Sequence, residues 1–246
     1  MPRYDIGERV LFTHAGKRQR GRVTGVDRQK RRIVSDSGKR LMAPALGMRP
    51  SPDRVLILET RLERNLKKSK RFYGPMMQQW LQAMHVDALY ERVHTMDDVK
   101  KFLQAEGKNV STRIVHFMGH GKKDHGKGMA SLHLTFEWID LGDPDHLEIF
   151  RGLNGKVLIF SCCQVGADAK AMLAVKEISG AAAVIAYRKE VNDWYTNVAE
   201  GMLYERLINA PAMSPKKVVR LVTKAIDLLG IRLPDEVTRK PVLVCF

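Results

Sequence analysis

The first fifty residues show a short alternation of apolar and polar positions. Apolar residues alternate with polar ones in the runs ERVLFTH, RGRVTGVD, RRIVSDS and RLMAPAL. The segments AGKRQRG, DRQKR and SGK separate these runs. Alternation over four to eight residues between turn-forming segments is typical of strands with one buried face. We therefore predict a small antiparallel sheet or barrel over residues 1–50.

The rest of the chain, residues 51–246, follows a different pattern. The segment MRPSPDR at 48–54 marks the change, because its prolines interrupt any regular element. Continuous apolar runs such as RVLILET, TRIVHFM, KVLIFSC and AAAVIAY then alternate with amphipathic helical segments. Strands that are apolar throughout are buried on both faces, as in a parallel sheet covered by helices. We therefore predict a second domain of the α/β class.

Composition narrows the class of protein further. The sequence has no run of eighteen or more uncharged apolar residues, and its first residues lack the apolar segment of a secretory signal. The three cysteines, two of them adjacent, cannot form a disulfide framework and fit a reducing compartment. We therefore expect a cytoplasmic protein without membrane contact.

Positive charge is concentrated at the start of the chain. The net charge is +15, and residues 1–50 hold thirteen lysines and arginines against four aspartates and glutamates, a net charge of +9. Such a basic module favours an acidic partner, and the candidates are nucleic acid, an acidic protein surface and an anionic membrane. The alternative is a basic surface that is only solvated and binds no partner. No aromatic stacking platform accompanies the charges, which argues against single-stranded RNA. The predicted partner-binding residues, on or beside the presumed turns, are Lys17, Arg18, Arg20, Arg22, Arg31 and Arg32.

The segment IVHFMGHGKKDHGKGMA, residues 114–130, is compatible with three functions: nucleotide binding, metal binding and catalysis by an imidazole. Residues 121–127 match the letters of a phosphate-binding loop. However, Gly128 stands where a magnesium-binding Ser or Thr belongs, and the following residues alternate like a strand where a helix should begin. The histidines 116, 120, 125, 133 and 146 lack a recognised metal-ligand spacing. We therefore predict neither a nucleotide nor a metal cofactor.

The third chemistry combines a thiol with an imidazole. IVHFMGHG ends one predicted strand with His120 and Gly121, and VLIFSCCQVG ends another with two cysteines and Gly166. The carboxyl ends of parallel strands lie at one edge of a sheet, where functional residues gather. A thiol is a strong nucleophile, a nearby imidazole can exchange its proton, and glycines leave backbone N–H groups accessible to an oxyanion.

Taken together and in this order, these blocks resemble the caspase-like (clan CD) cysteine peptidases, and within them the CHAT family. The resemblance covers about residues 54–246 and includes the segment ISGAAAVIAYRKEVND. It implies a caspase-like sheet flanked by helices, and the N-terminal stretch is similar to SH3-like barrels. The chain departs from the family at Tyr187 and Arg188, where CHAT proteins usually carry Trp-Pro, which affects the expected shape of the substrate pocket.

The resemblance also implies individual roles. The Cys-x-x-Gly spacing selects Cys163 as nucleophile, and His120 is the matching imidazole. The implied oxyanion donors are the backbone N–H groups of Gly121 and Cys163. Strand alternation places the Cys162 side chain on the opposite face, in the core. Further expectations are that His116 packs against a helix, that Cys245 belongs to the core, and that Glu190, Asp193 and Asp124 are candidates for a pocket wall.

The resemblance therefore implies a cysteine endopeptidase that cleaves protein substrates through an acyl-enzyme, without a cofactor. Family members in bacteria often act in regulated proteolysis or antiviral defence under the control of a partner protein. The alternative is a catalytically idle caspase-like scaffold, recruited to nucleic acid or a protein through residues 1–50. The presence of both His120 and Cys163 argues against idleness.

Overall fold

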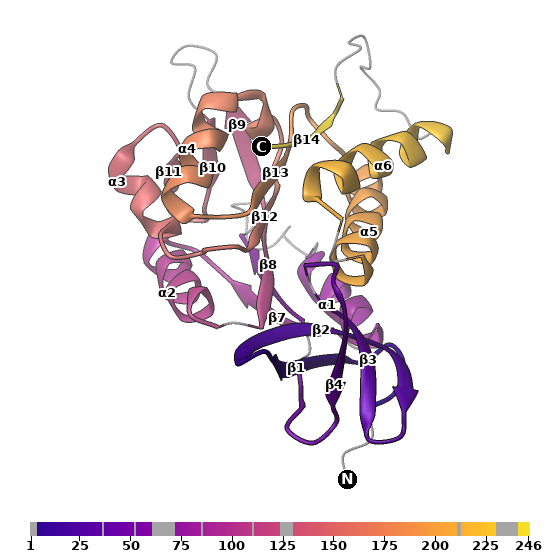
Figure 1. The fold of residues 1–246 in the computed structure, drawn as a ribbon. Helices are drawn as coiled ribbons and strands as arrows, with labels where there is room; N and C mark the ends of the chain where they lie inside the picture. Colours follow the sequence, from indigo (N-terminus) through magenta and orange to yellow (C-terminus); the bar gives the residue numbers. More distant parts are fainter. Residues whose placement is uncertain are drawn as a thin grey trace.

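A computed structural model describes most of the chain and contains three sheets with flanking helices (Figure 1). The first sheet is antiparallel and five-stranded, the second is three-stranded, and the third is six-stranded and mostly parallel. The α/β class with a parallel sheet is thereby confirmed. The described residues are 4–35, 37–51, 53–60, 72–84, 86–109, 111–123, 130–210, 213–229 and 241–246.

The first sheet, called here the N-terminal sheet, has the strand order β4-β3-β2-β1-β5. Each pair of neighbours is antiparallel, so the sheet consists of sequential hairpins closed by β5 against β1. Its small core includes Val10, Phe12, Val23 and Ile33, the inward residues of the alternation. The strands are β1 (Arg9–His14), β2 (Lys17–Asp27), β3 (Lys30–Ser35), β4 (Arg40–Pro44) and β5 (Arg49–Pro50).

One expected loop of this sheet is part of a strand. The segment AGKRQRG was predicted to separate two strands, but only Ala15 and Gly16 form the turn, with φ of 50° and 73°. Positive φ at both central residues is typical of two-residue hairpin turns. Strand β2 therefore begins at Lys17, and the basic residues after it lie on a strand and not on a loop.

The six-stranded sheet, called here the central sheet, has the order β14-β13-β12-β8-β6-β7. All neighbouring strands are parallel except β14, which runs antiparallel to β13 at one edge. Most of its residues are buried, as the continuous apolar runs predict. The strands are β6 (Arg54–Glu59), β7 (Asp87–Arg92), β8 (Thr112–Met118), β12 (Val157–Ser161), β13 (Ala183–Tyr187) and β14 (Leu243–Cys245).

Helices cover both faces of the central sheet (Figure 1). One face packs against α2 and α4, and the other packs against α1, α5 and α6. Helix α2 begins after Thr95, whose side chain forms a capping box with Asp98, as the sequence indicates. The helices are α1 (Gly74–Ala83), α2 (Met96–Gly107), α3 (Pro144–Leu147), α4 (Ala169–Ser179), α5 (Asp193–Asn209) and α6 (Pro215–Leu228), with short 3₁₀ turns at Glu148–Phe150 and Val165–Ala167.

The three-stranded sheet is formed by the segment that follows β8. Its order is β11-β10-β9, with β9 (His120–Lys123), β10 (Ala130–His133) and β11 (Trp138–Asp140). This result confirms that the residues after the glycine-rich segment form strands and not the helix that a phosphate-binding loop requires.

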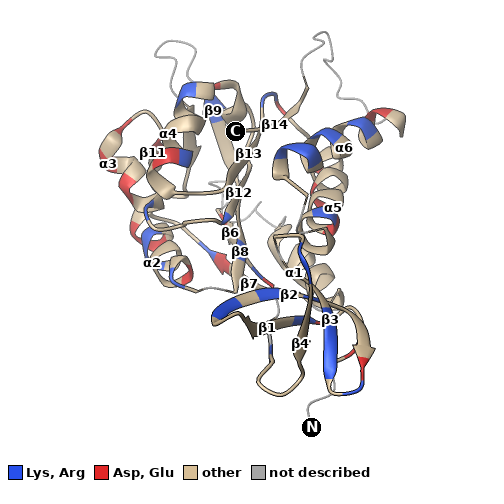
Figure 2. Ribbon diagram, in the orientation of Figure 1, with Lys and Arg blue, Asp and Glu red and all other residues tan. Residues whose placement is uncertain are grey.

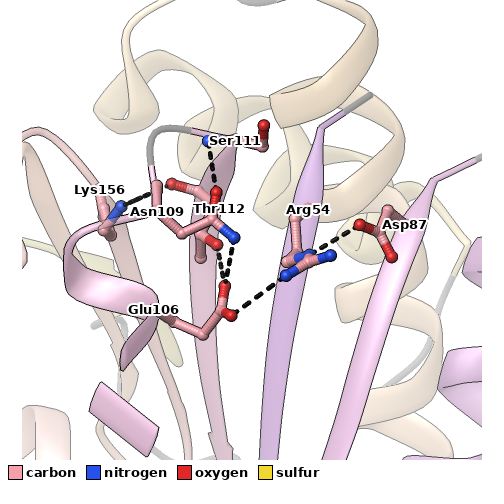
Figure 3. A network of polar contacts seen from close by, with 7 residues as sticks. All are labelled: Arg54, Asp87, Glu106, Asn109, Ser111, Thr112 and Lys156. Carbon is pink, nitrogen blue, oxygen red and sulfur yellow. Dashed lines mark hydrogen bonds and ion pairs between the residues drawn. The ribbon is translucent and has the colours of Figure 1, made fainter. Parts of the chain in front are cut away.

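A network of polar contacts joins the amino ends of the central strands (Figure 3). Arg54, at the start of β6, lies 2.7 Å from Asp87 and 3.1 Å from Glu106. Lys156, just before β12, donates two hydrogen bonds to backbone oxygens near the start of β8. These contacts fix the strand starts, at the end of the sheet opposite the candidate site. The other members of the network are Asn109, Ser111 and Thr112.

The N-terminal sheet contacts the central sheet through a buried ion pair. A guanidinium nitrogen of Arg9 lies 2.8 Å from the carboxylate of Asp53, and both side chains are at most 6% exposed. Arg113 approaches the same carboxylate at 3.7 Å. The backbone N–H of Ser51 also donates to the Arg9 oxygen at 3.0 Å. Part of the positive charge of the N-terminal residues, shown in Figure 2, therefore serves contacts within the chain.

We expect Asp53→Asn to destabilise the protein, because it removes the charge that faces two arginines. Removing one partner of a buried ion pair typically costs about 3–5 kcal/mol. The free energy of unfolding from urea denaturation should fall by an amount of that order. The control, Asp97→Asn at an exposed helix start, should cost less than about 1 kcal/mol. Equal stability of Asp53→Asn and the wild type would show that this contact contributes nothing.

Candidate active site

The parallel pairing of β8 and β12 places the predicted nucleophile and imidazole at neighbouring strand ends. Met118 and Ser161, the last residues of the two strands, are directly paired. The N–H of Gly119 then donates to the Ser161 oxygen at 3.2 Å, which continues the pairing by one residue. His120 and Cys163 each follow two residues after a strand end. Both therefore lie at the carboxyl edge, as the sequence predicts.

Gly121 lies directly against the backbone of the cysteine pair. A Cβ atom added to Gly121 would lie 2.7 Å from Cys162 Cβ and 2.9 Å from the Cys163 oxygen. Real Cβ atoms do not approach other atoms this closely, so any other residue would push the two loops apart. This contact brings the His-Gly and Cys-Cys segments together in space.

A tight turn fixes the position of Cys163. Gln164 adopts a left-handed conformation with φ of 63°, and a 3₁₀ turn follows at Val165–Ala167. Within that turn, a Cβ on Gly166 would lie 3.0 Å from the backbone of Ala186 on β13. The glycine of the Cys-x-x-Gly spacing thus allows close packing on the neighbouring strand.

The two adjacent cysteines have different environments. Cys162 is fully buried in the core, which confirms the prediction for it. Cys163 is partly buried, and its Sγ accepts a hydrogen bond from the Val191 N–H at 3.5 Å. Cys245 is partly buried and packs against the core at the edge strand. Of the pair, Cys163 alone presents a partly accessible thiol at the candidate site.

The surroundings of Cys163 favour the protonated thiol. Burial is the main cause that raises the pKa of Cys163 above its ordinary value, and the Val191 N–H partly offsets it. The negative charges of Glu190 and Asp193 raise this pKa further. The thiol therefore carries its proton at neutral pH and needs a base when it reacts. His120, exposed at the start of β9, lies at the same edge.

The two carboxylates predicted for the pocket wall lie near the thiol. Both are close enough to influence the pKa of Cys163. Glu190 accepts a hydrogen bond from the Gln164 side chain at 3.1 Å, and Asp193 accepts one from the Tyr73 hydroxyl. The thiol thus has acidic neighbours on one side. The third predicted wall residue, Asp124, lies outside the described residues.

A buried polar network under the site was not predicted from the sequence. Glu200 of α5 accepts hydrogen bonds from the hydroxyls of Ser161 and Tyr187. Its other oxygen lies 3.6 Å from Nε2 of His116, whose Nδ1 lies 2.6 Å from the Tyr204 hydroxyl. All of these side chains except that of Ser161 are fully buried. The contact with Tyr204 confirms that His116 packs against a helix.

Burial drives both ionisable groups of this network toward their neutral forms. It raises the pKa of Glu200 to about 7 and lowers the pKa of His116 to about 3. The signal in the sequence is a carboxylate in the apolar stripe of a helix, since Ala199, Leu203 and Tyr204 surround Glu200 on the buried face of α5. A buried carboxyl at such a position requires partners, and Ser161 links it to the strand that leads to Cys163.

The structure changes the set of candidate partner-binding residues. Arg31 is only 6% exposed, and its guanidinium donates to the Tyr4 oxygen at 2.9 Å, so its assignment to a partner surface was wrong. Arg22 donates to the Gly7 and Ile208 oxygens, and Arg20 is partly buried. The predicted residues that are exposed are Lys17, Arg18 and Arg32.

No protein-family model matches the chain, and a comparison with curated proteins gave no match. Among the described residues, no group of three or more His, Cys, Asp or Glu side chains could hold a metal ion. In the same part of the chain, no helix is long and apolar enough to cross a membrane.

We expect Glu200→Gln to change the pH dependence of stability. In the wild type, the raised pKa makes the folded state bind more protons than the unfolded state between pH 4.5 and about 7. The contribution of Glu200 to stability is therefore present at low pH and is lost as the pH rises to about 7. His116, with its lowered pKa, contributes in the opposite direction between about pH 3 and 6.5 in both proteins.

The free energy of unfolding of Glu200→Gln minus that of the wild type should thus increase from pH 5 to pH 7.5. Denaturant titrations at several pH values measure this difference. The exposed Glu177→Gln variant is the control, and its difference from the wild type should stay constant. A constant difference for Glu200→Gln as well would contradict the raised pKa.

We expect iodoacetamide to label Cys163 much faster than Cys162. The labelling rate rises with the fraction of thiolate and with solvent access to the sulfur. Cys162 is low in both, because it is fully buried and burial raises its pKa well above the ordinary value. Cys162→Ala should keep a site that reacts faster as the pH rises past the ordinary thiol value of about 8.5. Cys163→Ala should lose that site. Mass spectrometry of the labelled peptide gives the rate, and faster labelling of Cys162 would reverse the assignment.

Proposed function

We propose that the protein is a cysteine endopeptidase of the caspase-like type, with Cys163 as nucleophile and His120 as general acid and base. The observation that carries this proposal is the close approach of Gly121 to Cys163, which joins the His-Gly and Cys-x-x-Gly segments at one edge of a parallel sheet. The helices on both faces of that sheet agree with a caspase-like CHAT domain. The N-terminal sheet agrees with an SH3-like barrel.

The proposed reaction begins with the thiol protonated. Cys163 Sγ attacks the peptide carbonyl carbon while its proton passes to the imidazole of His120. The backbone N–H groups of Gly121 and Cys163 stabilise the resulting oxyanion. The imidazolium then donates the proton to the leaving amine, which leaves a thioester on Cys163. Water, activated by the imidazole, hydrolyses the thioester and restores the thiol.

The acidic neighbours of the thiol favour a basic residue on the amino side of the cleaved bond. Glu190 and Asp193 both act electrostatically on Cys163, so a positively charged side chain bound there would be attracted by both carboxylates and would offset part of their negative charge. It would also lower the pKa of Cys163 and favour the reactive thiolate. We therefore propose arginine or lysine at this position of the substrate.

The resemblance places such an enzyme in regulated bacterial proteolysis or antiviral defence, in the cytoplasm, with a partner protein that activates or recruits it. The exposed Lys17, Arg18 and Arg32 are the candidate contacts for an acidic partner. The alternative remains a scaffold without catalysis, recruited to nucleic acid or a protein through the N-terminal sheet. The raised pKa of Cys163 is the observation that favours this alternative, because a thiol that does not react needs no neighbour that lowers its pKa.

We expect Cys163→Ala to abolish cleavage of a fluorogenic peptide with arginine before the scissile bond. His120→Ala should lower kcat by about 10²–10⁴-fold, the usual contribution of a general acid and base. Cys162→Ala should keep most of the activity, because its side chain lies in the core. Initial rates over a range of substrate concentrations, with the melting temperature of each variant as a check of folding, measure these effects.

Three results would count against parts of this proposal. Loss of activity in Cys162→Ala alone, with an unchanged melting temperature, would identify Cys162 as the nucleophile. Faster cleavage after aspartate than after arginine would show that Glu190 and Asp193 do not select a basic residue. Full activity of Cys163→Ala would exclude the thiol mechanism. Selective alkylation of Cys163 without turnover, in the presence of the physiological partner, would favour the scaffold.

A further inference from the structure

A groove runs between α6 and β14, at the edge of the central sheet. Its volume is ≈ 530 Å³, and it lies between one face of the helix and the edge strand of the central sheet. Buried aliphatic side chains of Leu243 and Val244 belong to its wall. His120, Cys163, Glu190 and Asp193 are not among its described lining residues, and neither are residues of the N-terminal sheet.

Basic side chains form a regular row along the groove. Lys216, Arg220 and Lys224 follow one another at intervals of four residues on α6, so they share one helix face. All three are exposed, and Arg188, after the end of β13, also lines the groove. Among the described lining residues, Asp227 is the one that is acidic. Figure 2 shows this positive charge along α6.

The opposite wall of the groove is a strand with a free edge among the described residues. Strand β14 pairs with β13 and with no other described strand. Val184 and Phe246 exchange both backbone hydrogen bonds, and the Arg188 N–H donates to the Val242 oxygen. In an antiparallel pair the residues between such positions direct their N–H and C=O groups away from the partner strand. Leu243 and Cys245 therefore direct theirs toward the outer edge, where an extended chain can pair.

We propose that this groove binds an extended acidic segment of a partner protein. Successive cations on α6 are about 6 Å apart along the helix, from a rise of about 1.5 Å per residue. Alternate side chains of an extended chain are about 6.6 Å apart. Carboxylates at every second residue of the segment thus match the cation row, and apolar residues between them meet the aliphatic wall.

The chemistry of the groove favours a polypeptide over single-stranded nucleic acid. Nucleic-acid grooves combine cations with several aromatic side chains on which bases stack. Among the described residues that line this groove, Phe246 is the one aromatic side chain, and the others that are uncharged are mostly aliphatic. The edge of β14 adds backbone donors and acceptors, which recognise a peptide backbone.

The experiment measures binding with the full-length Cys163→Ala variant, so that the result does not depend on cleavage. The probe is a fluorescein-labelled twelve-residue peptide in which glutamate alternates with valine, and fluorescence anisotropy gives its Kd at low and at physiological salt. We expect saturable binding that weakens with salt, and a tighter Kd than for a peptide of the same composition with the glutamates in one block.

Charge reversal of the row tests the site itself. The variant K216E/R220E/K224E should weaken binding at least tenfold. The matched control K100E/K101E/K108E changes the same charge on exposed lysines of α2 and of its C-cap, on the opposite face of the central sheet, and should change Kd less than twofold. If the melting temperature shows that the reversed variant does not fold, K216Q/R220Q/K224Q replaces it, with a loss of at least fivefold expected.

The proposal is overturned if the alternating peptide does not bind, if both triple reversals weaken binding equally, or if the blocked peptide binds as well as the alternating one. It is also overturned if a single-stranded dT₁₂ oligonucleotide binds more tightly than the peptide and loses its binding in K216E/R220E/K224E. In that case the groove is a nucleic-acid site. None of these outcomes bears on the peptidase proposal, because the protein used lacks the thiol.

Discussion

The parallel pairing of β8 with β12 sets the geometry on which the candidate site depends. The strands end together at Met118 and Ser161, so the segments that follow them leave the sheet at the same level. Gly121 and Gly166 then hold these segments against each other and against β13, because neither position has room for a side chain. A shift of one residue in this pairing would separate His120 from Cys163 and turn the neighbouring side chains to the other face.

The site rests on a polar layer that is costly to bury. Glu200 and His116 are both fully enclosed, and burial shifts the pKa of each toward its neutral form because the interior disfavours charge. Their hydrogen bonds connect α5 to β8 and, through Ser161, to the strand that precedes the cysteines. Such a network favours one arrangement of the helix on the sheet, since another packing would remove the hydrogen bonds that Glu200 and His116 make with Ser161, Tyr187 and Tyr204.

The alternation of apolar residues was sufficient to predict most of the elements, because burial of strands and helix faces follows directly from it. Thr95 as a helix cap and Cys162 as a core residue were predictable for the same local reasons. The sequence did not show that β2 starts at Lys17, since a two-residue turn at Ala15 leaves no polar loop to recognise. The burial of Arg31 and the partners of Glu200 depend on contacts between distant segments, which no local pattern encodes.

The order of strands in the two larger sheets has a consequence for how the chain folds. The N-terminal sheet joins consecutive strands through short hairpins, so its contacts are local and inexpensive in loop-closure entropy. The central sheet pairs strands that are far apart in sequence, such as β6 with β8 and β13 with β14, and contacts of this kind form slowly. We therefore expect the N-terminal sheet to form first. Arg9 is then in place to pair with the Asp53 carboxylate, so the earliest-formed part of the molecule orients the first strand of the sheet that carries the candidate site.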